Sequence, residues 1–465
     1  MALRFFNTYS RTIEEFQPLD PAGRAVKMHT CGPTVYSHAH IGNFRAYIFE
    51  DLLQRHLEAR GYTVERVMNL TDVDDKTIRG SRAANLALGE FTAPFKEAFF
   101  EDVETLQIER ADAFPAATEE RFVAAMIGMI EKLIARELAY QAEDKSVYYR
   151  INRFPNYGHL AHFDLAELRS TGRVKSDEYD KEHVGDFALW KAWDEEDGDV
   201  WWESPWGRGR PGWHIECSAM ATALLGEQID IHCGGVDNIF PHHEAEIAQS
   251  EGCSGKTFVR YWMHCAHLLV DGQKMSKSLG NFHTLRDVLE KGYSGREVRY
   301  ALIRVHYRAP LNFTWEGMDE ARQALGRIDE WLRRLGESAA AATEAPEIED
   351  DKFSEALDDD LNISAALGHL FEQIRESNRE LDRGIEPARA RAWLNWWERI
   401  NRVLALAAVE EETPAEIQQL AEERTQARLA KNWQKSDELR DAIQAQGWAV
   451  RDTKEGQVVT RRAGA

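Results

Sequence analysis

The sequence contains few cysteines, no long hydrophobic run and fewer basic than acidic residues. Its five cysteines in 465 residues are scattered and odd in number, which argues against a disulfide framework and for thiols that stay reduced. No stretch approaches the roughly eighteen apolar residues of a membrane span, and the N-terminus lacks a signal-peptide pattern. These absences predict a cytoplasmic protein without a membrane segment.

The charge balance is strongly acidic. The chain has 57 Lys and Arg against 79 Asp and Glu, a net charge of −22. The overall field therefore repels a polyanion such as RNA. Residues 421–465 differ, with nine basic against seven acidic residues. A nucleic-acid partner would need local basic surface, and this tail is the candidate.

The first part of the chain has the pattern of a β-α-β unit. Strand-like runs at residues 25–30 and 63–70 flank a helical pattern from about residue 43 to residue 60, which Gly61 ends. Such a unit predicts a parallel sheet, with ligands at the carboxyl ends of its strands. Residues 31–43 follow the first strand and are therefore candidate ligand contacts.

A chain of this length exceeds one hydrophobic core and predicts several domains. The predicted fold class is α/β: a Rossmann-like parallel-sheet catalytic domain with an insertion, then an α-helical bundle and a small C-terminal α+β domain. Trp393, Trp396 and Trp397 occupy helical spacings that indicate core positions in the bundle. The predicted boundaries are 1–120 and 201–318 for the two halves of the catalytic domain, 121–200 for the insertion, 319–409 for the bundle and 410–465 for the last domain.

Two short motifs carry groups suited to phosphate chemistry. Residues 274–278, Lys-Met-Ser-Lys-Ser, place two ammonium groups on a short loop. Residues 40–43, His-Ile-Gly-Asn, place an imidazole, a glycine and an amide where the first strand gives way to a helix. Fixed cations and N–H groups stabilise the negative charge that develops when a phosphate is attacked, and a helix N-terminus faces anions.

Together the two motifs resemble the paired signatures of class I aminoacyl-tRNA synthetases, which join an amino acid to ATP and pass it to tRNA. The resemblance implies that Lys277 and His40 face the ATP phosphates, that Lys274 anchors its loop and that Gly42 makes room for adenine. Magnesium would accompany ATP. Asn43 departs from the signature, which usually ends in His, because an amide can donate a hydrogen bond but carries no charge.

Four further residues form a possible metal site. They are Cys31, Cys217, His242 and Glu246, and the last two are four apart, hence on one face of a helix. Zinc accepts sulfur, nitrogen and oxygen donors in this mixture. Because Cys31 follows the first strand, the metal would lie at the mouth of the active cleft. Cys233 is a rival ligand, and a buried hydrophobic role remains the alternative for each cysteine.

The segments around these donors, Cys-Gly-Pro-Thr, Gly-Trp-His-Ile-Glu-Cys and Phe-Pro-His-His-Glu-Ala-Glu, resemble cysteinyl-tRNA synthetases, and the resemblance covers essentially the whole chain. It implies L-cysteine, ATP and tRNA-Cys as partners, one zinc per chain, a monomer and an anticodon-binding C-terminal domain. The zinc would hold the substrate thiolate and reject serine, whose hydroxyl ionises far less readily. No editing domain is then needed.

The same resemblance assigns an amino-acid pocket. Thr71 and His232 would line it, Trp213 would cap it with an apolar wall, and Asp237 would bind the substrate ammonium or the ATP ribose. The alternative for each of these residues is a helix cap or a core position.

The tail offers candidate contacts to RNA on or near a predicted helix pair. Exposed aromatic rings stack on splayed bases, and basic groups hold phosphates. For the two tryptophans, packing inside the small domain is the alternative. The candidates are Trp433, Trp448, Arg424, Arg428 and Lys431.

Three other functions are compatible with parts of this pattern. The cysteine ligase of mycothiol synthesis shares the zinc site and the lysine loop, but that family generally lacks the region after residue 410. A zinc hydrolase built on His242 and His243 would lack the His-Glu-x-x-His spacing and leave the Lys274 loop unexplained. A non-catalytic binding module explains neither motif. The sequence therefore predicts a cysteine–tRNA ligase.

Overall fold

The computed structural model describes residues 2–163, 185–276, 279–342, 344–408, 414–453 and 456–461. Lys277, the lysine that the sequence assigns to the ATP phosphates, lies outside these residues, and so does Ser278. The other predicted site residues are described.

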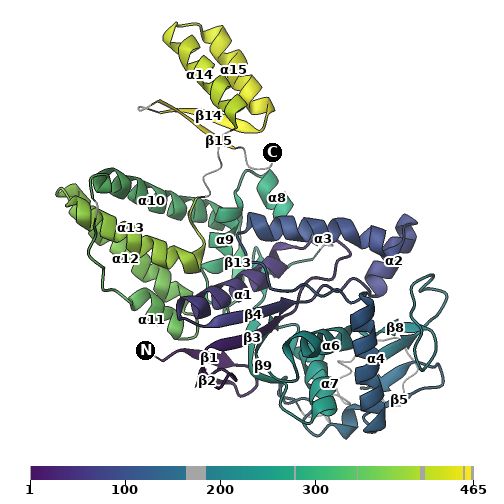
Figure 1. The fold of residues 1–465 in the computed structure, drawn as a ribbon. Coiled ribbons are helices and arrows are strands. Elements are labelled where there is room, and N and C mark those ends of the chain that lie inside the picture. The colour runs from purple at the N-terminus through teal and green to yellow at the C-terminus, as the bar shows by residue number, and fades with distance from the viewer. Residues whose placement is uncertain are drawn as a thin grey trace.

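A four-stranded parallel sheet lies at the centre of the catalytic unit (Figure 1). Its two central strands are β3 and β9, so the strand order reverses between them. This point, at the carboxyl ends of the strands, is where open α/β sheets bind ligands. In spatial order the strands are β10 (Val259–Cys265), β9 (Ile229–Gly235), β3 (Ala25–Thr30) and β4 (Thr63–Met68).

The helix between β3 and β4 confirms the predicted β-α-β unit. Helix α1 (Ile41–Ala59) starts two residues before the predicted start, because His40 and Asn43 cap it. It ends before Gly61, whose φ of +88° is a backbone conformation that side-chain-bearing residues rarely adopt. The apolar face of α1 packs against Ile231 and Cys233 of the sheet.

Two helices contact the sheet at the residues that alternate with these. Helix α6 (Trp213–Leu225) and helix α7 (Glu244–Ser254) share a core with Trp262, and His232 reaches Glu246 on α7. Because successive residues of a strand point to opposite faces, Cys233 faces α1 and His232 faces α7. The face of the sheet toward α1 therefore carries the thiol of Cys233, and the face toward α7 carries the imidazole of His232.

The insertion contains its own antiparallel sheet beside α4 (Figure 1). Its last strand, β8, is short, and it pairs with the end of β7. The elements between β4 and α6, which include this insertion, are α2 (Asp75–Ala84), α3 (Leu88–Thr105), α4 (Glu120–Ala135), β5 (Ala139–Gln141), β6 (Val147–Tyr149), β7 (Phe187–Ala192) and β8 (Gly209–Pro211).

Smaller elements complete the catalytic unit. A three-stranded sheet ends at Lys274 and so carries the start of the lysine loop. A hairpin of two strands precedes β3. These elements are β1 (Arg4–Asn7), β2 (Thr12–Glu15), β11 (Leu268–Val270), β12 (Gln273–Lys274), β13 (Leu311–Phe313), α8 (Leu285–Glu290) and α9 (Gly295–Ile303).

A helical bundle follows, as predicted. Trp393, Trp396 and Trp397 are all buried in it, which confirms their core positions. Helix α10 is long enough to cross a bilayer, but within the described ranges no helix is also apolar enough to do so. The bundle helices are α10 (Trp315–Ala339), α11 (Lys352–Asp358), α12 (Ile363–Asp382) and α13 (Pro387–Leu404).

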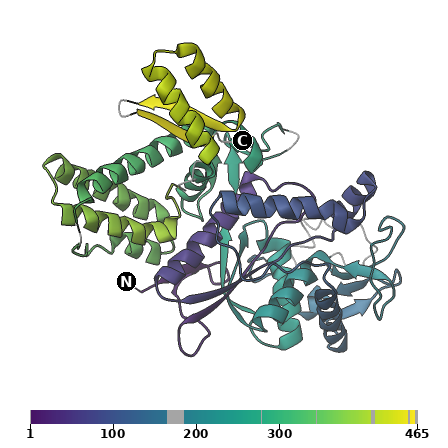
Figure 2. The ribbon, with the colours of Figure 1, turned by 45° about the horizontal axis from the view of Figure 1, so that its top comes forward.

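The last unit has the predicted helix pair and β tail, and Figure 2 shows it as a separate layer above the bundle. A small core of its own, including Ile417, Ile443 and Trp448, holds it together. Its elements are α14 (Ala415–Leu429), α15 (Trp433–Ala445), β14 (Trp448–Thr453) and β15 (Gly456–Arg461), and the two strands form an antiparallel hairpin.

A buried ion pair within the catalytic unit also connects it to the bundle, because its arginine donates to a carbonyl of α13. The Asp51 carboxylate on α1 accepts hydrogen bonds from Arg299 of α9 and from Arg55, 2.9 Å away. Burial alone would raise the pKa of Asp51, but the charges of Arg299 and Arg55 outweigh burial and hold that pKa below its usual range. The other donors of Arg299 bind the carbonyls of Leu106, Gln107 and Leu404, between 2.8 and 3.1 Å.

The same region satisfies the carbonyls at the end of α13. Arg55 donates to the carbonyl of Arg402, Arg299 to that of Leu404 and Arg296 to that of Leu406. The last carbonyls of a helix have no intrahelical partner and carry its negative dipole end, so guanidinium groups are suitable partners. The end of the bundle is thereby fixed against α1 and α9.

We expect Arg299→Gln to lower the free energy of unfolding by about 3–5 kcal/mol, because it removes the buried guanidinium group that pairs with Asp51 and donates to three carbonyls. Urea unfolding followed by tryptophan fluorescence measures the change. The control is Arg333→Gln, which removes an exposed arginine that pairs with Glu330 and Glu337 and should change stability little. Similar small changes in both variants would contradict the structural role of Arg299.

Candidate active site

The predicted metal donors meet at the carboxyl ends of the central strands. Cys31 follows β3, Cys217 lies on α6, His242 lies in the turn Ile239–His243 and Glu246 lies on α7. Their ligand atoms all lie within 4.8 Å of one another. His242 Nε2 is 3.1 Å from Glu246 Oε1, as the four-residue spacing predicts. Donors from three distant parts of the chain thus form one cluster.

A second set of four donors overlaps the first. Cys31 and Glu246 also lie within 4.8 Å of His232 and His243. His243 Nε2 is 3.2 Å from Cys31 Sγ, and His232 Nε2 is 2.9 Å from Glu246 Oε2. The sequence analysis did not assign His243 to this site, although its place in the His-His-Glu run was a signal. Cys233, the rival ligand, belongs to neither set, because it faces α1.

Further histidines contact these donors from outside. His214 Nδ1 lies 2.9 Å from His242 Nδ1, and His264 Nε2 lies 2.8 Å from His243 Nδ1. An imidazole that binds a metal through one nitrogen usually donates a hydrogen bond from the other, which fixes its ring. The sequence analysis missed His214 and His264, because their proximity depends on the register of the strands and helices.

The electrostatics of the cluster favour a cation. Burial raises the pKa of Glu246 well above its usual range and lowers the pKa of His242 and His243 well below theirs. The hydrogen bond with Cys31, followed by burial, raises the pKa of Cys217. Glu246 Oε1 is buried and accepts no hydrogen bond. A divalent cation would offset the burial of a carboxylate and two thiolates, so these donors fit a bound metal.

A polar cavity of about 250 Å³ opens beside the cluster. Cys31 lines it, so the cavity and the metal donors share a wall. Gly234 and Gly235, at the end of β9, form its floor near the strand-order reversal. Its lining also includes the predicted residues His40, Gly42, Asn43, Asp237 and Lys274.

His40 and Asn43 form a reciprocal cap at the start of α1. His40 Nδ1 accepts from the Asn43 backbone N–H at 3.2 Å, and Asn43 Oδ1 accepts from the His40 N–H at 3.1 Å. This capping box gives a structural reason for an amide at the fourth position of the motif. A Cβ on Gly42 would lie 2.9 Å from His40 Nδ1 and 3.0 Å from Met275 Cε. The space at Gly42 therefore accommodates these two side chains.

The predicted amino-acid pocket residues occupy different depths. Thr71 and His232 are buried and do not line the polar cavity, and the Thr71 hydroxyl donates to Glu216 Oε2 at 3.0 Å. Trp213 stacks on the His242 ring with centroids 4.5 Å apart and remains 47% exposed. Asp237 is exposed at the cavity wall. The structure thus brings Trp213 and Asp237 to surfaces that a ligand can reach.

Glu50 is a residue of the cavity wall that the sequence analysis missed. It lies on α1, is fully buried, and neither of its carboxylate oxygens has a hydrogen-bond partner. Burial raises its pKa to about 8, although the charge of Arg66 acts in the opposite direction. The sequence gives no signal for Glu50, because hydrophobic periodicity does not mark a single buried carboxyl group on a helix.

Three family models match consecutive parts of the chain. The tRNA synthetases class I (C) catalytic domain matches residues 16–323, the DALR domain residues 352–408, and the cysteinyl-tRNA ligase anticodon binding domain residues 410–459.

Curated relatives match over nearly the full length. The chain is 50% identical over 466 residues to the cysteine–tRNA ligase of Protochlamydia amoebophila (strain UWE25), covering 98% of this chain and 97% of that one. It is also 50% identical to the cysteine–tRNA ligase of Chlamydia felis (strain Fe/C-56), covering 99% and 98%.

Solved structures with a similar fold include Mycobacterium tuberculosis methionyl-tRNA synthetase in complex with methionyl-adenylate. Its TM-score is 0.57 at 14% identity, covering 82% of this chain and 88% of that one. The ternary complex of Agrobacterium radiobacter K84 agnB2 LeuRS with tRNA and LeuAMS has a TM-score of 0.59 at 12% identity, covering 85% and 87%. At these identities the likeness concerns the fold.

We expect Glu50→Gln to stabilise the protein increasingly as pH rises. Because burial raises the pKa of Glu50 to about 8, its favourable contribution is complete below the unfolded value of 4.5 and is lost as pH rises through 8. The difference in unfolding free energy between variant and wild type should grow by about 1.4 kcal/mol per pH unit between the two pKa values, 4.5 and about 8. Urea titrations at pH 5.5, 6.5 and 7.5 measure it.

The exposed glutamate Glu65 provides the control. Glu65→Gln should give curves that run parallel to the wild type across the same pH range. A Glu50→Gln curve that is also parallel to the wild type would show that Glu50 is already ionised in the folded protein.

Proposed function

The chain belongs to the cysteine–tRNA ligase family of class I aminoacyl-tRNA synthetases, and from this premise we propose that it activates L-cysteine with ATP and transfers it to tRNA-Cys. The observation that carries the proposal is the position of Cys31, which belongs to the metal-donor cluster and also lines the polar cavity. A cysteine held by its sulfur at the cluster would direct its carboxylate into that cavity, toward the residues proposed for ATP.

In the first step a carboxylate oxygen of cysteine attacks the α-phosphorus of ATP, and pyrophosphate leaves. Negative charge grows on the phosphates, and N–H groups and cations that already point there lower the barrier. We assign this role to His40 at the N-terminus of α1, to Lys277, and to Lys274, which lines the cavity. Asn43 and Gly42 contribute the shape of the same wall. Magnesium would accompany ATP.

We assign the metal as zinc, held by Cys31, Cys217, His242 and Glu246. Two sulfurs, an imidazole and a carboxylate are the donors that suit this ion. When bound, the ion supplies a positive charge that favours the thiolate of cysteine over the hydroxyl of serine. His214 contacts Nδ1 of His242, and the other ring nitrogen, Nε2, faces Glu246. This arrangement supports the set of Cys31, Cys217, His242 and Glu246 as the zinc ligands.

The remaining pocket assignments rest on placement. Trp213 stacks on His242 and would close the cysteine site from outside. Asp237 faces the cavity and would bind the substrate ammonium or the ribose. Thr71 and His232 lie deeper, where the Thr71 hydroxyl bonds Glu216 and His232 bonds Glu246, and they would hold the walls of the pocket in place.

The C-terminal domain is proposed to read the anticodon of tRNA-Cys. Trp433 is 57% exposed, and the Arg428 guanidinium lies 5.8 Å from its ring centroid. Lys431 is exposed beside them. Trp448 and Arg424 are buried in the small domain, so these two serve its structure. An exposed ring with adjacent cations suits the stacking of a splayed base. We further propose a monomer that works in the cytoplasm.

ATP–pyrophosphate exchange and elemental analysis together test the metal and the first step. We expect about one zinc per chain, and exchange with cysteine but not with serine. Cys217→Ser and His242→Ala should each lose most of the metal and of the exchange. Cys233→Ser is the matched control and should retain both, because Cys233 faces the opposite side of the sheet.

Two results would contradict this proposal. Exchange with another amino acid and none with cysteine would remove the proposed substrate. Metal retained in Cys217→Ser and lost in His243→Ala would assign the ion to the alternative donor set of Cys31, His232, His243 and Glu246.

Trp433→Ala tests the anticodon domain. Loss of one stacked base costs about 1–3 kcal/mol, so kcat/KM for aminoacylation of tRNA-Cys should fall roughly tenfold or more. Exchange with cysteine should be unchanged, because the domain is remote from the cavity. Full aminoacylation by the variant would show that the exposed ring does not contact the anticodon.

A further inference from the structure

A second cavity, of about 230 Å³, borders the metal-donor cluster from the side of the insertion. Trp213 and His214, which contact the metal donor His242, form one wall. Ala188 of β7 and Pro211 of β8 form the wall on the insertion side. The cavity thus lies between the catalytic sheet and the insertion, next to where the cysteine sulfur is proposed to be held.

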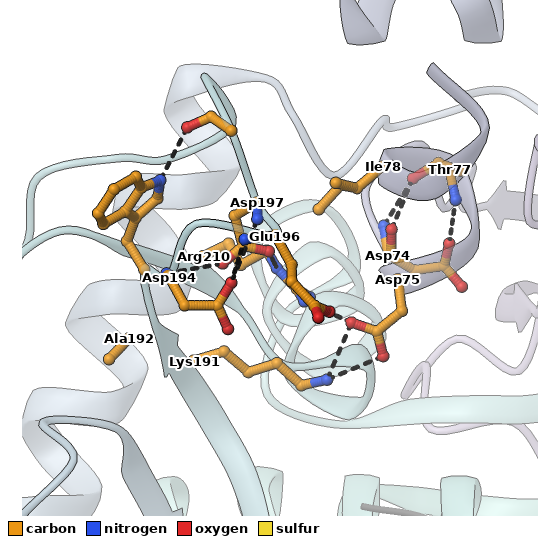
Figure 3. A network of polar contacts seen from close by, with 12 residues as sticks. Asp74, Asp75, Thr77, Ile78, Lys191, Ala192, Asp194, Glu196, Asp197 and Arg210 are labelled. Atoms are coloured by element: carbon orange, nitrogen blue, oxygen red, sulfur yellow. Dashed lines mark hydrogen bonds and ion pairs between the residues drawn. The ribbon is translucent and has the colours of Figure 1, made fainter. Parts of the chain in front are cut away.

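Asp75, Lys191 and Arg210, which line this second cavity, belong to a network of ion pairs (Figure 3). The Asp75 carboxylate at the start of α2 lies 3.1 Å from the Lys191 ammonium and also accepts from Arg210. Arg210 Nε donates to Asp197 at 2.7 Å. Burial would raise the pKa of Asp75, but Arg210 and Lys191 lower it below its usual range. The network ties the insertion strands to α2, so the walls are preorganised.

The charges of this network are matched within it. The remaining carboxylate, Asp74, accepts from the backbone N–H groups of Lys76 and Thr77 at 2.8 Å as the cap of α2. Among the residues that the structure describes, the Lys76 ammonium pairs with no carboxylate and lies 5.0 Å from the ring centroid of Tyr36. The rim of the cavity therefore offers one exposed cation.

The wall of the cavity also offers an aromatic face. One face of the Trp213 ring lies on His242, and yet 47% of the side chain is exposed. Trp213 is also one of the residues that line this cavity, so its exposed part is available to a ligand there. An aromatic face beside a single cation is the combination that binds one nucleotide of a single strand, by stacking and by a phosphate contact.

The second step of the reaction needs such a site. A ribose hydroxyl oxygen must attack the cysteinyl carbonyl carbon; the new ester bond forms, the bond to the adenylate phosphate breaks, and AMP leaves and takes up the hydroxyl proton. The carbonyl carbon lies only two bonds from the carbon that bears the sulfur, so the hydroxyl must come close to the metal donors. The first cavity is then filled by the adenylate.

We propose that the second cavity binds the terminal adenosine of tRNA, with its base against the exposed part of the Trp213 ring and its 5′-phosphate at Lys76. This inference rests on the proposed function, because it requires that the acyl group be delivered to tRNA. Lys191, Arg210 and Asp75 are positioning residues that hold the insertion wall against α2.

The test combines a protein change with a tRNA change. Lys76→Gln should weaken binding of full-length tRNA-Cys by about three- to tenfold. It should also lower the slope of log K against log salt concentration by about 0.7, the value of one single-strand phosphate. With tRNA-Cys that lacks the terminal adenosine and its phosphate, the variant and the wild type should bind equally. Arg79→Gln, which removes an exposed charge from the same helix outside the cavity lining, should have no effect that depends on the terminal adenosine.

A second variant fills the cavity. Ala188→Leu should slow single-turnover transfer from preformed cysteinyl-adenylate at least tenfold, while exchange with cysteine stays at the wild-type rate. Its thermal unfolding shows whether it folds, and Lys76→Gln, at an exposed position, tests the proposal independently of that result.

The outcomes separate the two proposals. A wild-type protein without cysteine-dependent exchange would overturn the proposed function. If exchange is normal and Lys76→Gln weakens both tRNAs equally, or neither, the terminal adenosine does not bind in this cavity. Loss of exchange in Lys76→Gln would place the cavity in the activation step and would also overturn the inference.

Discussion

The rest of the structure depends on how Asp51 of α1 is satisfied. This single buried carboxylate accepts from Arg299, Arg55 and the Glu109 N–H, and the two arginines also bind the carbonyls at the end of α13. Helix α1 thereby has its middle fixed to the bundle while its first turn forms the wall of the polar cavity. Because an unpaired buried charge is strongly unfavourable, α1, α9 and α13 are held in one arrangement. This arrangement of the helices also fixes the position of His40, which caps the start of α1.

The metal donors present the opposite situation. The Asp51 carboxylate meets the guanidinium groups of Arg299 and Arg55, whereas Glu246 lies among imidazoles and thiols, with one oxygen unbonded. Burial drives each of these groups toward its neutral form, and a divalent cation reverses that preference for the carboxylate and the thiols. These donors therefore fit a bound cation, whereas the charge of Asp51 is matched by groups of the protein itself.

The acidic charge of the chain is compatible with an RNA partner because binding depends on local surface. The described acidic residues at the second cavity, Asp74 and Asp75, are engaged by backbone N–H groups or by Lys191 and Arg210, whereas the exposed Lys76 ammonium pairs with no described carboxylate. In the C-terminal domain Arg428 and Lys431 lie next to the exposed Trp433. A negative total charge would then slow non-specific association more than specific binding.

The sequence by itself determined the β-α-β unit, the bundle tryptophans, the C-terminal helix pair and the four candidate metal donors, because each leaves a local signal: periodicity, a cap or donor spacing. It could not find the overlapping donor set that includes His243, place Cys233 on the far face of the sheet, or find Glu50, His214 and the second cavity. Those features depend on strand register and on contacts such as Asp75 with Arg210, between residues far apart in the chain. Only the tertiary structure decides which face a residue presents and which distant groups surround it.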